Sequence, residues 1–165
     1  MAPDELDRRM MLLARNEARA AFEAGEVPIG CVVARDGQVV GRGRNAMEGL
    51  KDATAHAEMM ALTAACGSVG DWRLDGCTLY ATLEPCPMCA GAILNSRISR
   101  VVYAAPDQRL GACGSTMDVL RGNPINREVV VESGLMAEES VALMKEFFAR
   151  LRKKGGKRPE PAENC

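Results

Sequence analysis

With 165 residues, of which 47% are apolar and 26% are charged, the chain has the size and composition of a single globular domain. No window approaches the run of about 18 apolar residues that a membrane-spanning helix needs, and the charges around the short N-terminal apolar run are not typical of a secretory signal. We therefore expect a cytoplasmic protein that does not bind membranes. The net charge of −1 excludes a surface that is basic throughout.

The N-terminal residues predict a helix followed by a hairpin. Asp4 is a candidate N-cap, apolar residues recur at helical spacing after it, and Gly25 is the expected end of the helix. Two β-branched runs then flank Asp36-Gly37, a dipeptide that is a strong hairpin signal. After the hairpin we expect a loop over residues 44–52, a helix over 54–66 that stops at Gly67, and a strand over 77–82. A helix over 86–95 and a strand over 98–105 should follow. The last expected elements are a Gly-rich loop over 106–125 with one helical turn at 117–120, a strand over 127–134 and a helix over 137–153.

The resulting order of elements, α-β-β-α-β-α-β-β-α, indicates the fold class. Strands that alternate with helices favour an α/β fold, in which helices cover both faces of a sheet. The hairpin contributes an antiparallel pair, so the sheet should be mixed. We expect one domain over residues 1–154 and a disordered tail over residues 155–165.

Of the seven cysteines in the chain, Cys86 and Cys89 form the one close pair. The odd count and the scattered spacing argue against a disulfide framework. Because the pair stands at the start of a predicted helix, both sulfurs can face one point, and the free helical N–H groups favour the thiolate that binds metals. Taken alone, the pair is also compatible with a redox site or with two core cysteines.

His56, the only histidine, adds a third candidate ligand. One imidazole and two thiolates give three zinc ligands and leave a fourth position open, which is typical of catalytic zinc sites. A structural zinc site would need a fourth protein ligand, which another cysteine or Glu58 could supply.

Glu58 lies two residues after His56. Positions two apart are separated by roughly 200° on a helix, so spacing alone does not place both on one face. Near a helix start the longer glutamate side chain could still reach the metal and shuttle protons; the alternative is a surface glutamate beside a helix N-terminus. The pattern H-x-E followed by P-C-x-x-C, with Pro85 before Cys86, is the signature of zinc deaminases that act on nucleobases.

The C-terminal part of the chain is locally basic. Such a segment can bind phosphates, or it can be a solvated helix end whose cations suit the helix dipole. Its cations are Lys145, Arg150, Arg152, Lys153, Lys154, Lys157 and Arg158.

These residues make the chain resemble the cytidine-deaminase-like superfamily, and within it the bacterial adenosine deaminases that act on tRNA. The resemblance runs from about Glu26 to Arg152. Its segments are EVPIG at 26–30, Asn45, TAHAEMMAL at 54–62, TLYATLEPCPMCAGAI at 78–93, SRISRVVYAA at 96–105, Asp107, GACGSTMDVL at 111–120 and FFARLR at 147–152.

The resemblance implies a three-layer α/β/α sandwich around a mixed five-stranded sheet, and a homodimer in which both subunits contribute to each RNA site. It implies hydrolytic deamination of adenosine to inosine at the wobble position of a tRNA anticodon, with an arginine tRNA as the expected substrate, one zinc ion per subunit and no organic cofactor. The residue roles that it implies are zinc ligation by His56, Cys86 and Cys89, proton shuttling by Glu58, hydrogen bonding of the flipped base by Asn45, contact with the nucleotide backbone by Asp107, packing beside the splayed loop by Phe148, and proximity to phosphates for Arg150 and Arg152.

Two alternatives remain at this point. Guanine and cytosine deaminases share the metal motif but act on free bases, and they would have no need for a basic C-terminal helix. A non-catalytic, zinc-containing RNA-binding subunit could keep the metal ligands while losing the proton shuttle, but Glu58 is present here. Met47 and Pro106 depart from residues common in the resembled family, which concerns loop contacts rather than the metal ligands.

Overall fold

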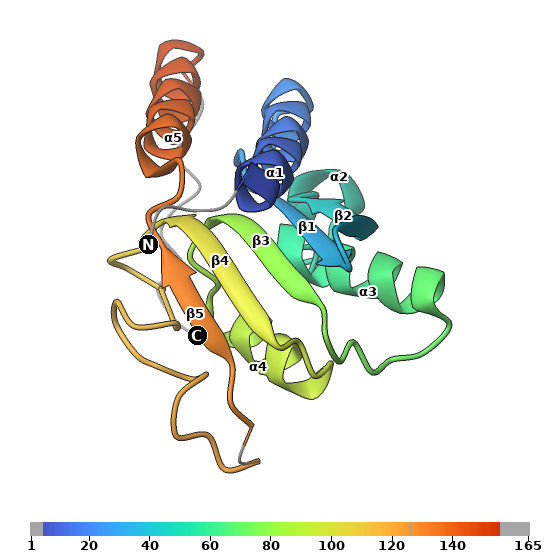
Figure 1. Ribbon diagram of the computed structural model, residues 1–165. Helices are drawn as coiled ribbons and strands as arrows, with labels where there is room; N and C mark the ends of the chain where they lie inside the picture. Colours follow the sequence, from blue (N-terminus) through green and yellow to red (C-terminus); the bar gives the residue numbers. More distant parts are fainter. Residues whose placement is uncertain (1–4, 126, 156–165) are drawn as a thin grey trace.

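The computed structural model describes residues 5–125 and 127–155 (Figure 1). Each helix and strand that the sequence predicts is present except the helical turn at 117–120, and one short helix is added. The elements are α1 (Glu5–Glu23), β1 (Gly30–Arg35), β2 (Gln38–Arg44), α2 (Met47–Leu50), α3 (Ala57–Val69), β3 (Thr78–Leu83), α4 (Pro87–Asn95), β4 (Arg100–Ala105), β5 (Val130–Ser133) and α5 (Ala137–Lys153).

The strands form one mixed five-stranded sheet in the order β2-β1-β3-β4-β5. Strand β1 is antiparallel to β2 and β3, whereas β3, β4 and β5 run parallel. The β1-β2 hairpin turns at Asp36 and Gly37, whose φ angles of 50° and 75° suit the tight turn that this dipeptide predicts. In Figure 1, α1 and α5 lie on one face of the sheet and α3 and α4 on the other, which confirms the three-layer sandwich.

Each face of the sheet carries its own apolar core. The α1 face packs Met10 and Met11 against Val32 and Val102. The opposite face holds α3 and α4, and the buried helix residues there are mostly small, so both helices lie close to the strands. They are Ala57, Ala61, Leu62, Ala65, Ala90, Ile93 and Leu94.

Glycines in β2 let α3 lie directly on the sheet. A Cβ atom on Gly43 would run into the backbone of Ala57 and Ala61, and Gly41 faces the next turn of α3 in the same way. Because α3 begins immediately after His56, this close approach determines where His56 stands relative to the sheet.

Helix α3 ends later than predicted. Gly67 was the expected stop, but the helix continues to Val69 and ends at Gly70, which has a φ of 75° and donates its N–H to the Cys66 carbonyl. The left-handed conformation that favours glycine is therefore at Gly70, whereas Gly67 stands in open space within the helix.

Two predicted loops also differ from expectation. Residues 47–50 form the short helix α2 inside the expected 44–52 loop. The helical turn predicted at 117–120 was wrong: Cys113 and Asp118 form an isolated antiparallel bridge, and the Gly111 carbonyl accepts N–H groups from Thr116 and Met117. These contacts fold the loop back on itself and leave no helical hydrogen-bond pattern there.

Helix α5 spans the predicted residues but is less buried than its apolar pattern indicates. Phe147 is buried, whereas Val141 is 38% exposed. The helix packs on α1, β3 and β4. Four large apolar side chains of α5 are half-buried in a single chain: Leu143, Met144, Phe148 and Leu151.

Some predictions fall outside the described residues. The Asp4 cap and residues 156–165 of the predicted tail belong to this group. Within the described ranges, none of the helices combines the length and the apolar character needed to cross a bilayer.

An ionic network around the buried Asp7 joins α1 to the sheet. The Asp7 carboxylate accepts hydrogen bonds from the Tyr80 hydroxyl (2.7 Å) and from two nitrogens of Arg100 (2.8 and 2.6 Å), and Arg100 also pairs with Glu132 (3.0 Å). The Arg100 guanidinium lowers the pKa of Asp7 below its ordinary value. The folded state therefore favours the ionised form of Asp7.

At pH 7, Asp7→Asn should lower the free energy of unfolding by about 1–3 kcal/mol, because the amide keeps the shape but not the charge. The pKa of Asp7 is lower in the folded than in the unfolded chain, so ionisation stabilises the fold above about pH 4, and this contribution is lost as the pH falls through the folded pKa. Urea unfolding as a function of pH measures the effect, and the gap between variant and wild type should narrow below about pH 4.

The matched control for this experiment is Glu5→Gln, which changes an exposed carboxylate in the same first helical turn. We expect it to stay within about 0.5 kcal/mol of the wild type. A gap for Asp7→Asn that is equal at all pH values would contradict the role of ionised Asp7.

Candidate metal centre and active site

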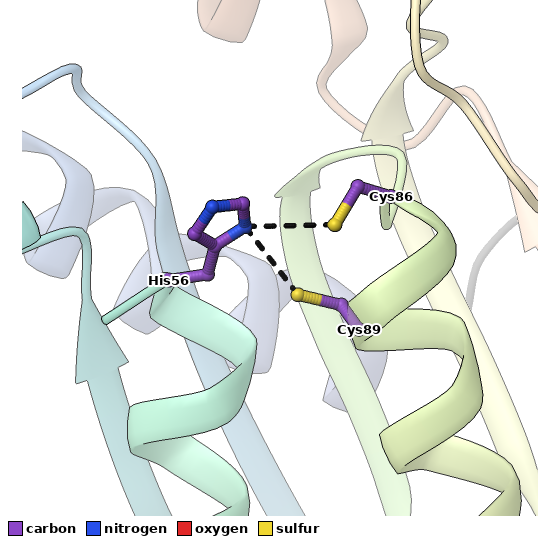
Figure 2. A group of neighbouring side chains, drawn as sticks. All are labelled: His56, Cys86 and Cys89. Carbon is purple, nitrogen blue, oxygen red and sulfur yellow. Dashed lines mark hydrogen bonds between the residues drawn. The ribbon is translucent and has the colours of Figure 1, made fainter. Parts of the chain in front are cut away.

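Three candidate metal ligands meet at the N-terminal ends of α3 and α4 (Figure 2). His56 is the residue before α3, with extended backbone (φ −75°, ψ 153°), and Cys86 holds the same place before α4 (φ −74°, ψ 173°). Cys89 lies in the first turn of α4. Figure 2 shows the imidazole and both sulfurs pointing toward one another, and their ligand atoms all lie within 4.8 Å of one another.

The distances within the cluster fit a tetrahedral metal ion. His56 Nδ1 lies 3.6 Å from the sulfurs of both Cys86 and Cys89. With zinc bonds of about 2.0–2.1 Å to nitrogen and about 2.3 Å to sulfur, tetrahedral geometry places these ligand types roughly 3.6 Å apart. Among the described residues, the cluster has these three members and no fourth protein ligand. The donor set therefore fits a metal site with one open position rather than a closed structural site.

The surroundings favour a thiolate at Cys86. A hydrogen bond from the Cys89 thiol, together with His56, lowers the pKa of Cys86 to about 4. The N-terminus of α4 adds partial positive charge at the same place. In turn, interaction with Cys86 raises the pKa of His56 and of Cys89. A metal ion would displace the remaining thiol proton, because the thiolate is the form that ligates.

Glu58 lies beside this cluster and not at the surface. It belongs to the first turn of α3 and is only 4% exposed. Its carboxyl interacts with Cys86, His56 and Cys89, and burial raises its pKa to about 7. The alternative of a surface glutamate is thus wrong. The angle of 200° between positions two apart does not apply, because His56 precedes the helix in an extended conformation.

Asn45 lies directly after β2 and is 5% exposed. Its N–H donates to the Ile29 carbonyl (3.1 Å), and the N–H of Ala46 donates to the Ala55 carbonyl (3.0 Å), one residue before His56. Asn45 therefore belongs to a segment that is hydrogen-bonded to the start of α3.

Asp107 lies two residues after β4 and is half-buried. Its Oδ1 accepts the N–H groups of Arg109 (2.9 Å) and Leu110 (3.3 Å), so the side chain closes a turn within its own loop. Its own N–H donates to the Glu84 carboxylate (3.0 Å). The structure thereby connects the Asp107 loop to the segment that leads into Cys86.

Phe148, Arg150 and Arg152 stand in a different layer of the molecule. Helix α5, which carries them, covers the face opposite α3 and α4 (Figure 1). The Arg150 guanidinium lies 4.8 Å from the centre of the Phe22 ring and forms an ion pair with a glutamate one turn earlier (2.9 Å). Phe148 packs edge-on against the neighbouring Phe147 ring, and Arg152 is exposed. Within one chain, these residues do not join the metal cluster.

Sequence reasoning missed two buried carboxylates near the site. Glu26 accepts the N–H groups of Glu48 (3.2 Å) and Gly49 (2.7 Å) and so holds the loop after Asn45. Glu84 is 2% exposed; burial opposes its ionisation, but hydrogen bonds from Ser115 and from backbone N–H groups lower its pKa. A glutamate between a buried strand and a proline is the signal that could have identified Glu84.

Comparisons with known proteins agree with this geometry. The chain matches the MafB19-like deaminase family over residues 5–152. It is 45% identical to the tRNA-specific adenosine deaminase of Bacillus subtilis (strain 168), over 93% of this chain and 94% of the relative. A solved tRNA:A34 deaminase, of the kind that edits A to I at the wobble position of transfer RNA, is similar with a TM-score of 0.76 and 44% identity, covering 82% of this chain and 98% of that one.

A second group of solved structures has a similar backbone but a less similar sequence. Guanine deaminase from Nitrosomonas europaea has a TM-score of 0.72 and 26% identity, covering 86% of this chain and 84% of that one. The chain therefore belongs to the MafB19-like deaminase family, among the tRNA-specific adenosine deaminases of bacteria.

Proposed function

We propose that the protein deaminates adenosine to inosine at the wobble position of a tRNA anticodon, in the cytoplasm, with an arginine tRNA as substrate. One observation carries this proposal: the cluster of His56, Cys86 and Cys89 with the buried Glu58 beside it, in a chain 45% identical to a tRNA-specific adenosine deaminase. We further propose that residues 1–154 form the deaminase unit and that two chains form a homodimer.

His56, Cys86 and Cys89 would hold one zinc ion per subunit, and the separations of 3.6 Å between nitrogen and sulfur support this ligand set. A zinc ion bound there would supply a Lewis acid that makes water a better nucleophile. The proposal includes no organic cofactor.

Glu58 carries the proton transfers of the reaction. It accepts a proton from the attacking water and delivers it to the purine ring while the oxygen adds to C6 of adenine. It then takes the second proton from the hydroxyl group now bonded to C6 and passes it to the amino group as the C6–N bond breaks, so that adenosine and water give inosine and ammonia. Its position beside the ligand sulfurs, shielded from solvent, supports this role.

Substrate contacts are assigned to two loops and to α5. Asn45 hydrogen-bonds the flipped base, and Asp107 contacts the nucleotide backbone. Phe148 packs beside the splayed loop, with Arg150 and Arg152 near its phosphates. Since α5 lies in the layer opposite α3 and α4, the proposal places these residues at an RNA site to which both subunits contribute.

A free-base deaminase is the second candidate. The similarity of the backbone to guanine deaminase favours it, because the same fold accepts a free base there. The higher identity to tRNA-specific enzymes favours RNA. A non-catalytic subunit is less well supported, since Glu58 is both present and buried beside the ligands.

We expect the purified protein to contain one zinc ion per chain. His56→Ala should weaken zinc binding at least about 100-fold, because removing a ligand lowers metal affinity more than removing a residue that only hydrogen-bonds a ligand. Zinc analysis after dialysis against a chelator measures this. Cys86→Ala should behave like His56→Ala, whereas Cys66→Ala, which removes a cysteine outside the cluster, should keep its zinc. Tight one-to-one zinc in His56→Ala would show that other residues hold the metal.

Glu58→Gln should keep zinc and RNA binding but lower kcat by about 10²–10⁴-fold, because the amide cannot accept the proton. The assay is inosine formation in an anticodon stem-loop of an arginine tRNA. Glu48→Gln, an exposed position, serves as the control and should retain wild-type activity. Inosine formation at near wild-type rate by Glu58→Gln would refute the shuttle assignment and with it the proposed mechanism.

Arg152→Gln should raise the KM for the stem-loop about three- to tenfold. It should also reduce the slope of log affinity against log salt concentration by about one, which corresponds to the loss of one phosphate contact. The matched control is Arg73→Gln, beyond the far end of α3, where Arg73 pairs with Asp71 (3.2 Å). Titrations at several salt concentrations measure the slope. Equal slopes for Arg152→Gln and Arg73→Gln would contradict the assignment of α5 to the RNA site.

A further inference from the structure

Glu84, directly after β3, holds the loop of residues 107–115 (the 107–115 loop) by four hydrogen bonds. Oε1 accepts the N–H groups of Cys113 and Ser115 (3.0 Å each). Oε2 accepts the N–H of Asp107 (3.0 Å) and the hydroxyl of Ser115. Each oxygen thus takes two donors, so an acceptor is required at both positions.

The 107–115 loop is also joined to the residue after Glu84. The Pro85 carbonyl accepts the N–H of Ala112 (2.9 Å). Gly111 lies so close to the carboxylate that a Cβ atom there would overlap Oε2 and the carboxyl carbon of Glu84. The segment at Glu84 and Pro85 and the 107–115 loop therefore form one hydrogen-bonded unit.

This unit connects two parts of the proposed active site. In the chain, Pro85 leads directly into Cys86, one of the three metal ligands. On the other side, the first turn of the loop carries Asp107 and Arg109, which are half-buried and exposed, respectively. The position of that turn relative to the metal ligands therefore depends on the Glu84 carboxylate, which joins the loop to the segment before Cys86.

We propose that Glu84 is a positioning residue, which holds the 107–115 loop beside the metal centre so that Asp107 and Arg109 meet the anticodon loop. This inference rests on the proposed function, because it requires RNA as the substrate. Glu84 differs from Glu58 in this respect: its four hydrogen bonds go to the loop, so it acts through the loop on substrate binding.

The test is Glu84→Gln, which keeps the shape but turns one oxygen into an NH₂ group that faces two donors. Zinc content should stay at one ion per chain. Hydrogen exchange at the amides of Asp107, Cys113 and Ser115 should accelerate by about tenfold or more. The KM for the stem-loop should rise by about tenfold, with kcat within about threefold of wild type.

Asp7→Asn is the matched control, since it makes the same change at an equally buried carboxylate on the other face of the sheet. It should lower stability without altering exchange in the loop or the KM. Ser115→Ala, which removes only the hydroxyl donor, should move exchange and KM in the same direction as Glu84→Gln but less, and it stands in for Glu84→Gln if that variant does not fold.

Three results would overturn the proposal: unchanged exchange in the loop, faster exchange with an unchanged KM, or loss of zinc, which would mean that Glu84 acts through Cys86. If the wild type itself forms no inosine in the stem-loop, the proposed function fails and the RNA part of this inference fails with it. The exchange measurement still shows in that case whether Glu84 holds the loop.

Discussion

His56 and Cys86 occupy the same place in two different helices, since each is the last residue before a helix begins. Both helices start at one edge of the sheet, so the side chains that precede them meet, and Cys89 joins from the first turn of α4. Helix N-termini favour thiolate through their free N–H groups and partial positive charge. The close packing of α3 on Gly43 determines where this helix begins and therefore where His56 stands, and Glu58 is buried in the first turn of the same helix.

Buried carboxylates give the surrounding loops their shape. Glu26 holds the loop after Asn45, and Glu84 holds the loop that begins at Asp107. Each carboxylate accepts hydrogen bonds from loop N–H groups that lack a partner within a helix or strand. The loops that the proposed function assigns to the substrate are therefore fixed from the interior of the protein.

Much of this arrangement was predictable from sequence, because it depends on local patterns. The hairpin follows from Asp36-Gly37, and the ligand set follows from the spacing around His56 and Cys86. The place of Glu58 was not predictable from helix geometry, because that geometry fails at a residue that only precedes the helix. The place of Glu84 between a strand and a proline could have identified the residue, but its contacts span 23 to 31 residues of sequence, and no local pattern predicts those partners. Gly67 and Gly70 are equally plausible ends of α3 from the sequence, and only the left-handed backbone conformation of Gly70 identifies it as the residue that ends the helix.

The same backbone serves enzymes with different substrates. The guanine deaminase and the tRNA:A34 deaminase resemble this chain about equally in shape, with TM-scores of 0.72 and 0.76, although their identities are 26% and 44%. In the proposed function, the three metal ligands and Glu58 account for the deamination reaction, whereas the loops and α5 account for the choice of substrate.

The most direct test offers the protein an arginine-tRNA anticodon stem-loop with a wobble adenosine beside free guanine, cytosine and cytidine, and measures all products in parallel. The account predicts inosine in the stem-loop and no turnover of the three small molecules. Turnover of a free base without inosine in the RNA would keep the metal centre but contradict the assignment of RNA as the substrate.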